Sequence, residues 1–232
     1  MEGWKRIKKG AEAELYLTQW LGTPAIIKRR IPKPYRRPDF DLQLRKARTL
    51  KEASLMLAAK RQGVPVPSLL CVDVVETSLV MEYIEGPTLR DLLVAGTDVN
   101  WAMHQVGRYV GRLHRGGLVH GDLTTSNMII SGGRVFLLDF GLGDYSTSIE
   151  ARGVDLHLML RALESLVPSK ARELFSIVLK GYAEMMGGLT QEVVKRALLV
   201  RSRGRYVEER RVKQVFRTGK NVTYPSEEAW LP

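Results

Sequence analysis

Two aspartates and an asparagine stand close together in the stretch "HGDLTTSNMIISGGRVFLLDFG", residues 120 to 141. Asp122 precedes Asn127 by five positions, and Asp139 follows Asp122 by seventeen. Carboxylate and amide oxygens are ligands that Mg²⁺ prefers, with nucleotide phosphates and water completing its octahedron. If Asn127 and Asp139 hold such a cation, Asp122 is left to orient a nucleophile or to accept its proton.

A β-hairpin must position these groups. Strand-forming residues lie on both sides of Gly132-Gly133, a pair that suits a two-residue turn. Because a hairpin brings its two ends together, Asn127 and Asp139 should meet. From these residues alone the stretch is either a metal-dependent catalytic centre or a polar structural loop.

The rest of the chain separates into a strand-rich part and a helical part. About the first 80 residues carry β-branched and aromatic runs, interrupted by one helix from about Phe40 to Arg61. After Gly86-Pro87 the apolar residues recur at helical spacing. We therefore expect an α+β chain with a strand-rich lobe over residues 1–84, a helical lobe over 85–207 and a basic tail over 208–232.

The net charge of +11 is concentrated in two basic clusters, residues 28–37 and 195–220. Such an excess favours polyanions or acidic proteins as partners. The single cysteine, Cys71, excludes an intramolecular disulfide and suits a reducing cytoplasm. No run of eighteen uncharged apolar residues occurs, so we expect neither a membrane span nor a signal peptide.

The string "HGDLTTSN…LLDFG" resembles the catalytic loop and metal-binding motif of the protein-kinase-like superfamily, written HRDxxxxN and DFG. The resemblance implies that Asp122 is the catalytic aspartate and that Asn127 and Asp139 bind Mg²⁺. It also implies that Asp155, on a later helix, supports the backbone of the catalytic loop together with His120.

The same superfamily requires an ATP site upstream, and a candidate for each part is present. Lys28 in "AIIK" matches the lysine that holds the α- and β-phosphates, and Glu52 matches the helix glutamate that orients it. By the same resemblance, the backbone of Glu82 and Ile84 bonds the purine edge. The remaining candidates for ATP contact form a reduced phosphate-covering loop: Lys9, Gly10, Ala11, Glu12 and Ala13.

Three features depart from ordinary protein kinases. The covering loop has one glycine where several are usual, although backbone amides approach phosphate best without a Cβ. Gly121 replaces the arginine that meets a phosphorylated activation loop, so regulation by such phosphorylation is not expected. Only thirteen residues separate Gly141 from Asp155, and no A-P-E motif follows, so we expect a helical lobe without a full activation segment.

The run "IKRRIPKPYRRPDFDLQLRKARTLKEASLM", residues 27 to 56, is similar to the signature of the small atypical kinases of the KEOPS (EKC) complex. Together with "KKGAEAEL", "MEYIEG" and "HGDLTTSNMI", the resemblance extends over residues 5 to about 207. It implies an Mg²⁺- and ATP-dependent serine/threonine kinase and ATPase that supports threonylcarbamoyladenosine formation at position 37 of tRNAs reading ANN codons. The implied partners are the threonylcarbamoyl-transferase subunit and a small accessory subunit of that complex.

The second basic cluster has a candidate partner in tRNA, because lysine and arginine side chains bind phosphate backbones. The candidate contacts are Arg201, Arg203 and Arg205. The alternative for this cluster is a solvated basic tail without a ligand. For the whole chain, three other interpretations stay open: an aminoglycoside-type small-molecule kinase, a RIO-like kinase, and a scaffold that binds ATP and tRNA without transferring phosphate.

Overall fold

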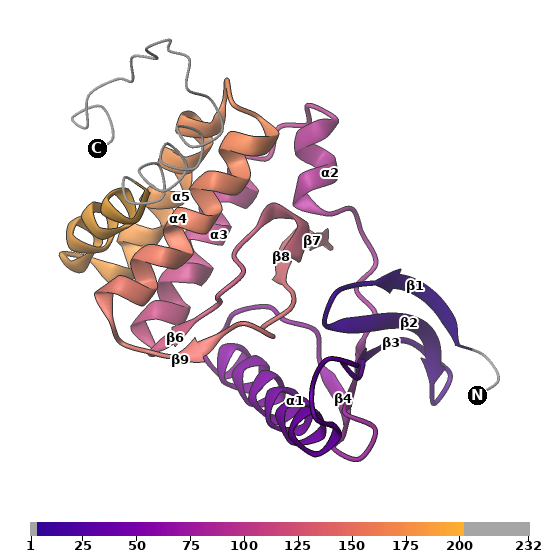
Figure 1. Ribbon diagram of the computed structural model, residues 1–232. Helices are drawn as coiled ribbons and strands as arrows, with labels where there is room; N and C mark the ends of the chain where they lie inside the picture. Colours follow the sequence, from indigo (N-terminus) through magenta and orange to yellow (C-terminus); the bar gives the residue numbers. More distant parts are fainter. Residues whose placement is uncertain (1–3, 202–232) are drawn as a thin grey trace, which may run out of the picture.

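The computed structural model describes residues 4–201, which form two lobes joined by a short connector (Figure 1). The N-terminal lobe is an antiparallel sheet of five strands in the order β1-β2-β3-β5-β4, with one long helix, α1, beside it. Its elements are β1 (Lys5–Lys9), β2 (Ala13–Trp20), β3 (Thr23–Arg30), α1 (Pro38–Arg61), β4 (Leu69–Asp73) and β5 (Ser78–Glu82).

The central strand β3 separates an apolar face from a charged one. Ala25 and Ile27 are buried with Val80 of β5 in a small cluster of their own. Because successive side chains of a strand point to opposite faces, Lys28 and Arg30 project together from the other face. Both are buried, so β3 presents two cations to the interior of the protein.

The helix α1 begins at a proline, and a glycine lies just beyond its end. Pro38 occupies the first turn, where its fixed φ fits and no N–H is needed. This start lies two residues before Phe40, the start expected from the sequence. At the other end Gly63 adopts a φ of 72°, which stops the helix. Between the ends, Glu52 lies on the buried face, so that a carboxylate faces the two cations of β3.

The C-terminal lobe is helical. Its helices are α2 (Leu89–Val94), α3 (Asn100–Arg115), α4 (Ile149–Leu166), α5 (Ala171–Met186) and a further helical stretch over residues 189–201. The α3 and α5 backbones pack so closely that a Cβ at Gly107 would lie 2.0 Å from the Val178 carbonyl oxygen. This position therefore requires glycine. An apolar core runs through this lobe and continues to Leu55 of α1.

Short strands lie on the side of the helical lobe that faces the sheet (Figure 1). They are β6 (Leu118–Val119), β7 (Met128–Ser131), β8 (Arg134–Leu137) and β9 (Asp144–Tyr145), with a 3₁₀ turn over Thr125–Asn127. β7 pairs with β8 through the expected turn, in which Gly132 and Gly133 both have positive φ. β6 pairs with β9.

The expected α+β architecture of two lobes is confirmed, including the single main helix of the first lobe and the short segment between Gly141 and α4. Over residues 4–201, none of the helices combines the length and the apolar character needed to cross a membrane.

Candidate active site

Four alternating charges connect the two lobes at the end of β3. The Lys28 Nζ lies 2.6 Å from Glu52 Oε1 and 2.6 Å from Asp139 Oδ1. The other oxygen of Glu52 accepts a bond from the Arg30 guanidinium, also at 2.6 Å. We call the series Arg30, Glu52, Lys28 and Asp139 the ion chain. Only its last member has a side chain with substantial exposure.

Asp139 has a positive φ of 59°, a backbone conformation that few residues other than glycine adopt. Its Oδ1 accepts a bond from the Gly141 amide at 3.1 Å as well as the Lys28 contact, which leaves Oδ2 for a cation. Burial alone would raise the pKa of Asp139, but the Lys28 ammonium and the Gly141 amide outweigh it and hold that pKa below its ordinary value. Asp139 is therefore an anion at neutral pH.

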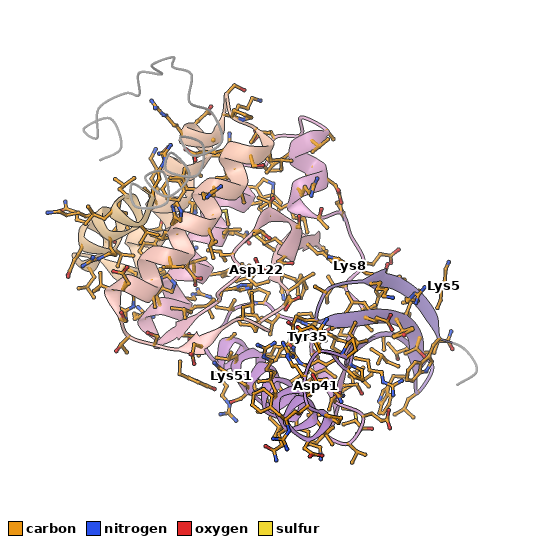
Figure 2. The ribbon with its side chains drawn as sticks, viewed as in Figure 1. Lys5, Lys8, Tyr35, Asp41, Lys51 and Asp122 are labelled. Atoms are coloured by element: carbon orange, nitrogen blue, oxygen red, sulfur yellow. The ribbon has the colours of Figure 1, made fainter. Side chains whose placement is uncertain are left out.

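Asn127 holds the catalytic-loop aspartate in place. Its Nδ2 donates to Asp122 Oδ2 at 2.7 Å and to the Asp122 carbonyl oxygen at 3.0 Å. The amide oxygen of Asn127 is therefore the atom left for a cation. The Leu138 amide donates to the Asn127 carbonyl at 2.9 Å, which fixes the two ends of the hairpin together. Figure 2 shows Asp122 between the helical lobe and the sheet.

His120 supports this loop as a neutral ring. Its Nε2 lies 3.0 Å from the Leu138 carbonyl oxygen, and its Nδ1 accepts from the Asp122 amide at 3.3 Å. One neutral tautomer satisfies both partners, with Nε2 as the donor. Burial lowers the pKa of His120 despite the nearby carboxylates, which favours the same uncharged form.

Asp155 of α4 anchors the backbone of the catalytic loop. Its two carboxylate oxygens accept from the His120 amide at 2.6 Å and the Gly121 amide at 2.8 Å. His114 Nε2 donates to the same carboxylate at 3.2 Å, and Tyr182 lies 2.8 Å from the other His114 nitrogen. Burial opposes ionisation of Asp155, yet the His114 contact and the other donors hold its pKa below the ordinary value.

His114 and Tyr182, both of which are fully buried, were not predicted from the sequence as parts of the site. The only available signal for His114 was a histidine in a helix six residues before His120. Tyr182 carries no motif at all. Arg30 was also missed as a partner of Glu52, although its spacing of two from Lys28 places both side chains on one face of a strand.

Two cavities between the lobes share Lys28 and Asp139 in their walls. The first, of about 180 Å³, is mainly apolar and is lined by residues that include Ile26, Met56, Met81, Ile84 and Leu138. The second, of about 250 Å³, lies between the covering loop and Asp122. Of the expected hinge residues, Glu82 already donates its amide to the Ser68 carbonyl at 2.9 Å, so its carbonyl is the group that a purine could use.

The covering loop is held by residues from the first basic cluster and from α1. Glu12 Oε2 lies 2.6 Å from an Arg48 guanidinium nitrogen, and Glu12 Oε1 lies 4.0 Å from Arg36. Lys33 donates to the Ala11 carbonyl. Since Arg29 also pairs with Glu76 and Arg30 with Glu52, much of the first basic cluster serves internal contacts.

Gly121 has a steric explanation that the sequence did not reveal. Its φ of 79° is unfavourable for other residues, and a Cβ there would lie 2.1 Å from the Leu142 carbonyl oxygen. The short segment after Asp139 therefore crosses directly over the position where ordinary kinases carry arginine.

That same segment is tied to α1. Lys51 pairs with Asp144 at 2.9 Å, and the Ser54 hydroxyl lies 2.7 Å from the Tyr145 hydroxyl. Lys51 and Ser54 lie on either side of Glu52 in the same turn of α1. They hold the helix that carries this glutamate against the segment after Asp139.

Most expected ATP and metal residues converge between the lobes. Of the expected tRNA contacts, the structure describes only Arg201. Arg201, at the end of the described chain, pairs with Glu164 at 2.6 Å. Arg203 and Arg205 lie outside the described residues.

A family model described as a RIO domain matches residues 30–143. The chain is 45% identical over 213 residues to the KEOPS complex subunit Bud32 of Pyrococcus abyssi, covering 88% of this chain and 97% of that protein. It is 38% identical over 203 residues to a probable serine/threonine-protein kinase BUD32 homolog of Archaeoglobus fulgidus, again covering 88% and 97%.

A longer relative carries a similar segment. The probable bifunctional tRNA threonylcarbamoyladenosine biosynthesis protein of Methanothermobacter thermautotrophicus is 45% identical over 202 residues. The match covers 87% of this chain but 36% of that protein, so this chain spans about a third of its length.

Two solved structures share the fold. The Rio2 kinase-ADP/Mg²⁺-phosphoaspartate complex from Chaetomium thermophilum matches with a TM-score of 0.61 at 17% identity, covering 88% of this chain and 72% of that one. WaaP in complex with acyl carrier protein matches with a TM-score of 0.56 at 14% identity, covering 87% and 88%. At these identities the likeness shows a protein-kinase-like fold alone. The two nearly full-length relatives show the family, and the chain belongs to the Bud32 family of KEOPS-complex kinases.

Proposed function

We propose that this protein is an Mg²⁺- and ATP-dependent phosphotransferase and ATPase that acts within KEOPS in threonylcarbamoyladenosine modification of tRNA. The observation that carries the proposal is the contact of Lys28 with both Glu52 and Asp139, in the wall of a mainly apolar cavity of about 180 Å³. A lysine held by one carboxylate and facing another is arranged to bind phosphate beside a metal ion.

The donor set fits Mg²⁺. Asn127 and Asp139 offer one amide oxygen and one carboxylate oxygen from the two ends of the same hairpin. Within residues 4–201 no group of three or more His, Cys, Asp or Glu side chains could hold a metal. This suits a cation that takes few protein ligands and obtains the rest from nucleotide phosphates and water. When bound, Mg²⁺ would neutralise the negative charge of those phosphates.

The chain's own residues would then act in sequence on one nucleotide. The apolar cavity would hold the purine against the connector, and Lys28 would bind the phosphates. Asp122, fixed by Asn127 and directed into the second cavity, would orient an attacking hydroxyl or water and accept its proton. His120 and Asp155 would keep the loop in this geometry without contacting the nucleotide.

The short segment after Gly141 supports hydrolysis, or phosphorylation of a docked partner, over activity on free peptides. Leu142 of this segment lines the second cavity, but the residues that follow it pair with β6 and α1. The longer archaeal relative supports a tRNA-modifying partner. In that protein a segment like this chain makes up about a third of a longer polypeptide, which is named as a probable bifunctional tRNA threonylcarbamoyladenosine biosynthesis protein.

The test is a reconstituted tRNA-modification assay with the KEOPS transferase and accessory subunits. Wild-type protein should support multiple rounds of modification only with Mg²⁺ and ATP. Asp139→Asn should assemble with the same subunits but lose this support, because it lacks the charged metal ligand. Full support by an assembled Asp139→Asn complex would refute the proposal.

A further inference from the structure

Arg30 gives Glu52 a second cation. The Lys28 ammonium lies 2.6 Å from one carboxylate oxygen of Glu52, and the Arg30 guanidinium lies 2.6 Å from the other. The Glu52 residue is only 1% exposed. Arg30 itself is 5% exposed. A lysine-glutamate pair alone would satisfy the kinase pattern, so this buried arginine requires its own explanation.

The inference rests on the proposed function, in which Lys28 binds the phosphates of ATP. Lys28 already contacts Glu52 and Asp139, and a bound triphosphate would add further anionic oxygens around one ammonium group. A buried carboxylate is strongly destabilised when the cation that pairs with it moves away. Glu52 would then either draw Lys28 away from the phosphates or leave its position.

Arg30 is held independently of any nucleotide. Its backbone amide donates to the Thr77 carbonyl at 3.1 Å, and its own carbonyl accepts from the Thr77 hydroxyl at 3.4 Å. Its guanidinium also reaches the Arg48 carbonyl of α1 at 3.5 Å. Guanidinium stays charged at any physiological pH and offers several donors in a fixed plane. It therefore pairs with Glu52 whether or not Lys28 is engaged elsewhere.

We propose that Arg30 is a positioning residue for phosphoryl transfer. It holds the Glu52 carboxylate between β3 and α1 while Lys28 turns from Asp139 toward the phosphates. Arg30 acts through Glu52, and it lets one lysine serve the nucleotide without leaving a buried carboxylate unpaired.

The test compares Arg30→Met and Arg30→Lys with a control, Arg29→Met, in the full chain. Arg29 is the adjacent residue on β3 but points to the opposite face, where it pairs with Glu76. Binding of adenosine, binding of Mg²⁺-ATP and steady-state phosphate release are measured for each. Arg30→Met should reduce ATP turnover roughly tenfold to a hundredfold, since small errors in positioning have effects of this size. Adenosine binding should be unchanged, Arg30→Lys should restore part of the loss, and Arg29→Met should match wild type.

A double-mutant cycle separates positioning from general support of the fold. In a Glu52→Gln background, Arg30→Met should add no further loss, because its effect requires the carboxylate. An equal loss in both backgrounds, or a loss no larger than that of Arg29→Met, would overturn the inference. If Arg30→Met does not fold, Arg30→Lys carries the same cycle. A wild-type protein no more active than Asp139→Asn would instead refute the proposed function and this inference with it.

Discussion

The two halves of the candidate site are held by different forces. The ion chain of the N-terminal lobe relies on charge pairs between long side chains, which a charged ligand can rearrange. The catalytic loop of the helical lobe relies on Asp155, whose carboxylate accepts hydrogen bonds from two backbone amides and from His114. We propose that the first half adapts to a bound nucleotide, whereas the second half keeps its shape.

Of the substitutions considered, Asp155→Ala should lower the stability of the protein most. Asp155→Ala leaves two buried amides and His114 without their acceptor, so the free energy of unfolding should fall by about 3–5 kcal/mol. Urea unfolding measures the loss, with Asp144→Ala as a matched control at an exposed aspartate. Equal stability of the two variants would show that the catalytic loop does not depend on this carboxylate.

Crowding the loop should have the next largest effect. In Gly121→Ala the new methyl group meets the Leu142 carbonyl and the backbone keeps an unfavourable φ, so stability should fall by about 1–3 kcal/mol. Gly132→Ala is the control, because its φ is also positive but its Cβ would meet no atom within 4 Å. Thermal unfolding should place Gly121→Ala well below Gly132→Ala. The reverse order would contradict the close crossing at Gly121.

The neutral ring of His120 predicts a pH dependence for the second half. Burial lowers the pKa of His120 in the folded protein, so below about pH 6.5 the unfolded chain binds a proton that the folded chain does not. Stability should therefore rise with pH through this range and fall as the pH is lowered. Urea midpoints at several pH values should show a shallower slope for His120→Gln. A slope identical to that of wild type would be evidence against a buried neutral ring.

The covering loop should show the smallest change in stability. Glu12→Gln weakens partly exposed pairs with Arg48 and Arg36, so the free energy of unfolding should change by no more than about 1 kcal/mol. The rate of ADP release should increase, because the loop is less firmly held. Stopped-flow fluorescence with a labelled nucleotide measures this rate, and an unchanged rate would mean that Glu12 does not restrain the loop.

Sequence reasoning succeeded where local pattern determines structure. The hairpin turn at Gly132-Gly133 and the order of a strand-rich part before a helical part follow from turn chemistry and periodicity. Contacts between residues that lie far apart in the sequence could not be predicted in this way. Tyr182 and His114 reach Asp155 only through the packing of α3, α4 and α5, which no short motif records.

The first basic cluster illustrates the same limit. In the sequence its charges allow contacts with nucleotide, protein or RNA. In the structure Arg29 pairs with Glu76, and Arg30 pairs with Glu52. Both acids lie more than twenty positions away in the sequence, so charge counting could not reveal that these two arginines are neutralised within the protein.

The most direct test of the central claim is the release or transfer of the γ-phosphate of ATP in the presence of Mg²⁺. Wild type is compared with Asp122→Asn and Asp139→Asn, and thermal unfolding establishes that all three are folded. We expect measurable turnover by wild type and a loss of at least about a hundredfold in each variant, because each substitution removes a group that stabilises developing charge or orients the nucleophile. Wild-type turnover in both folded variants would contradict it.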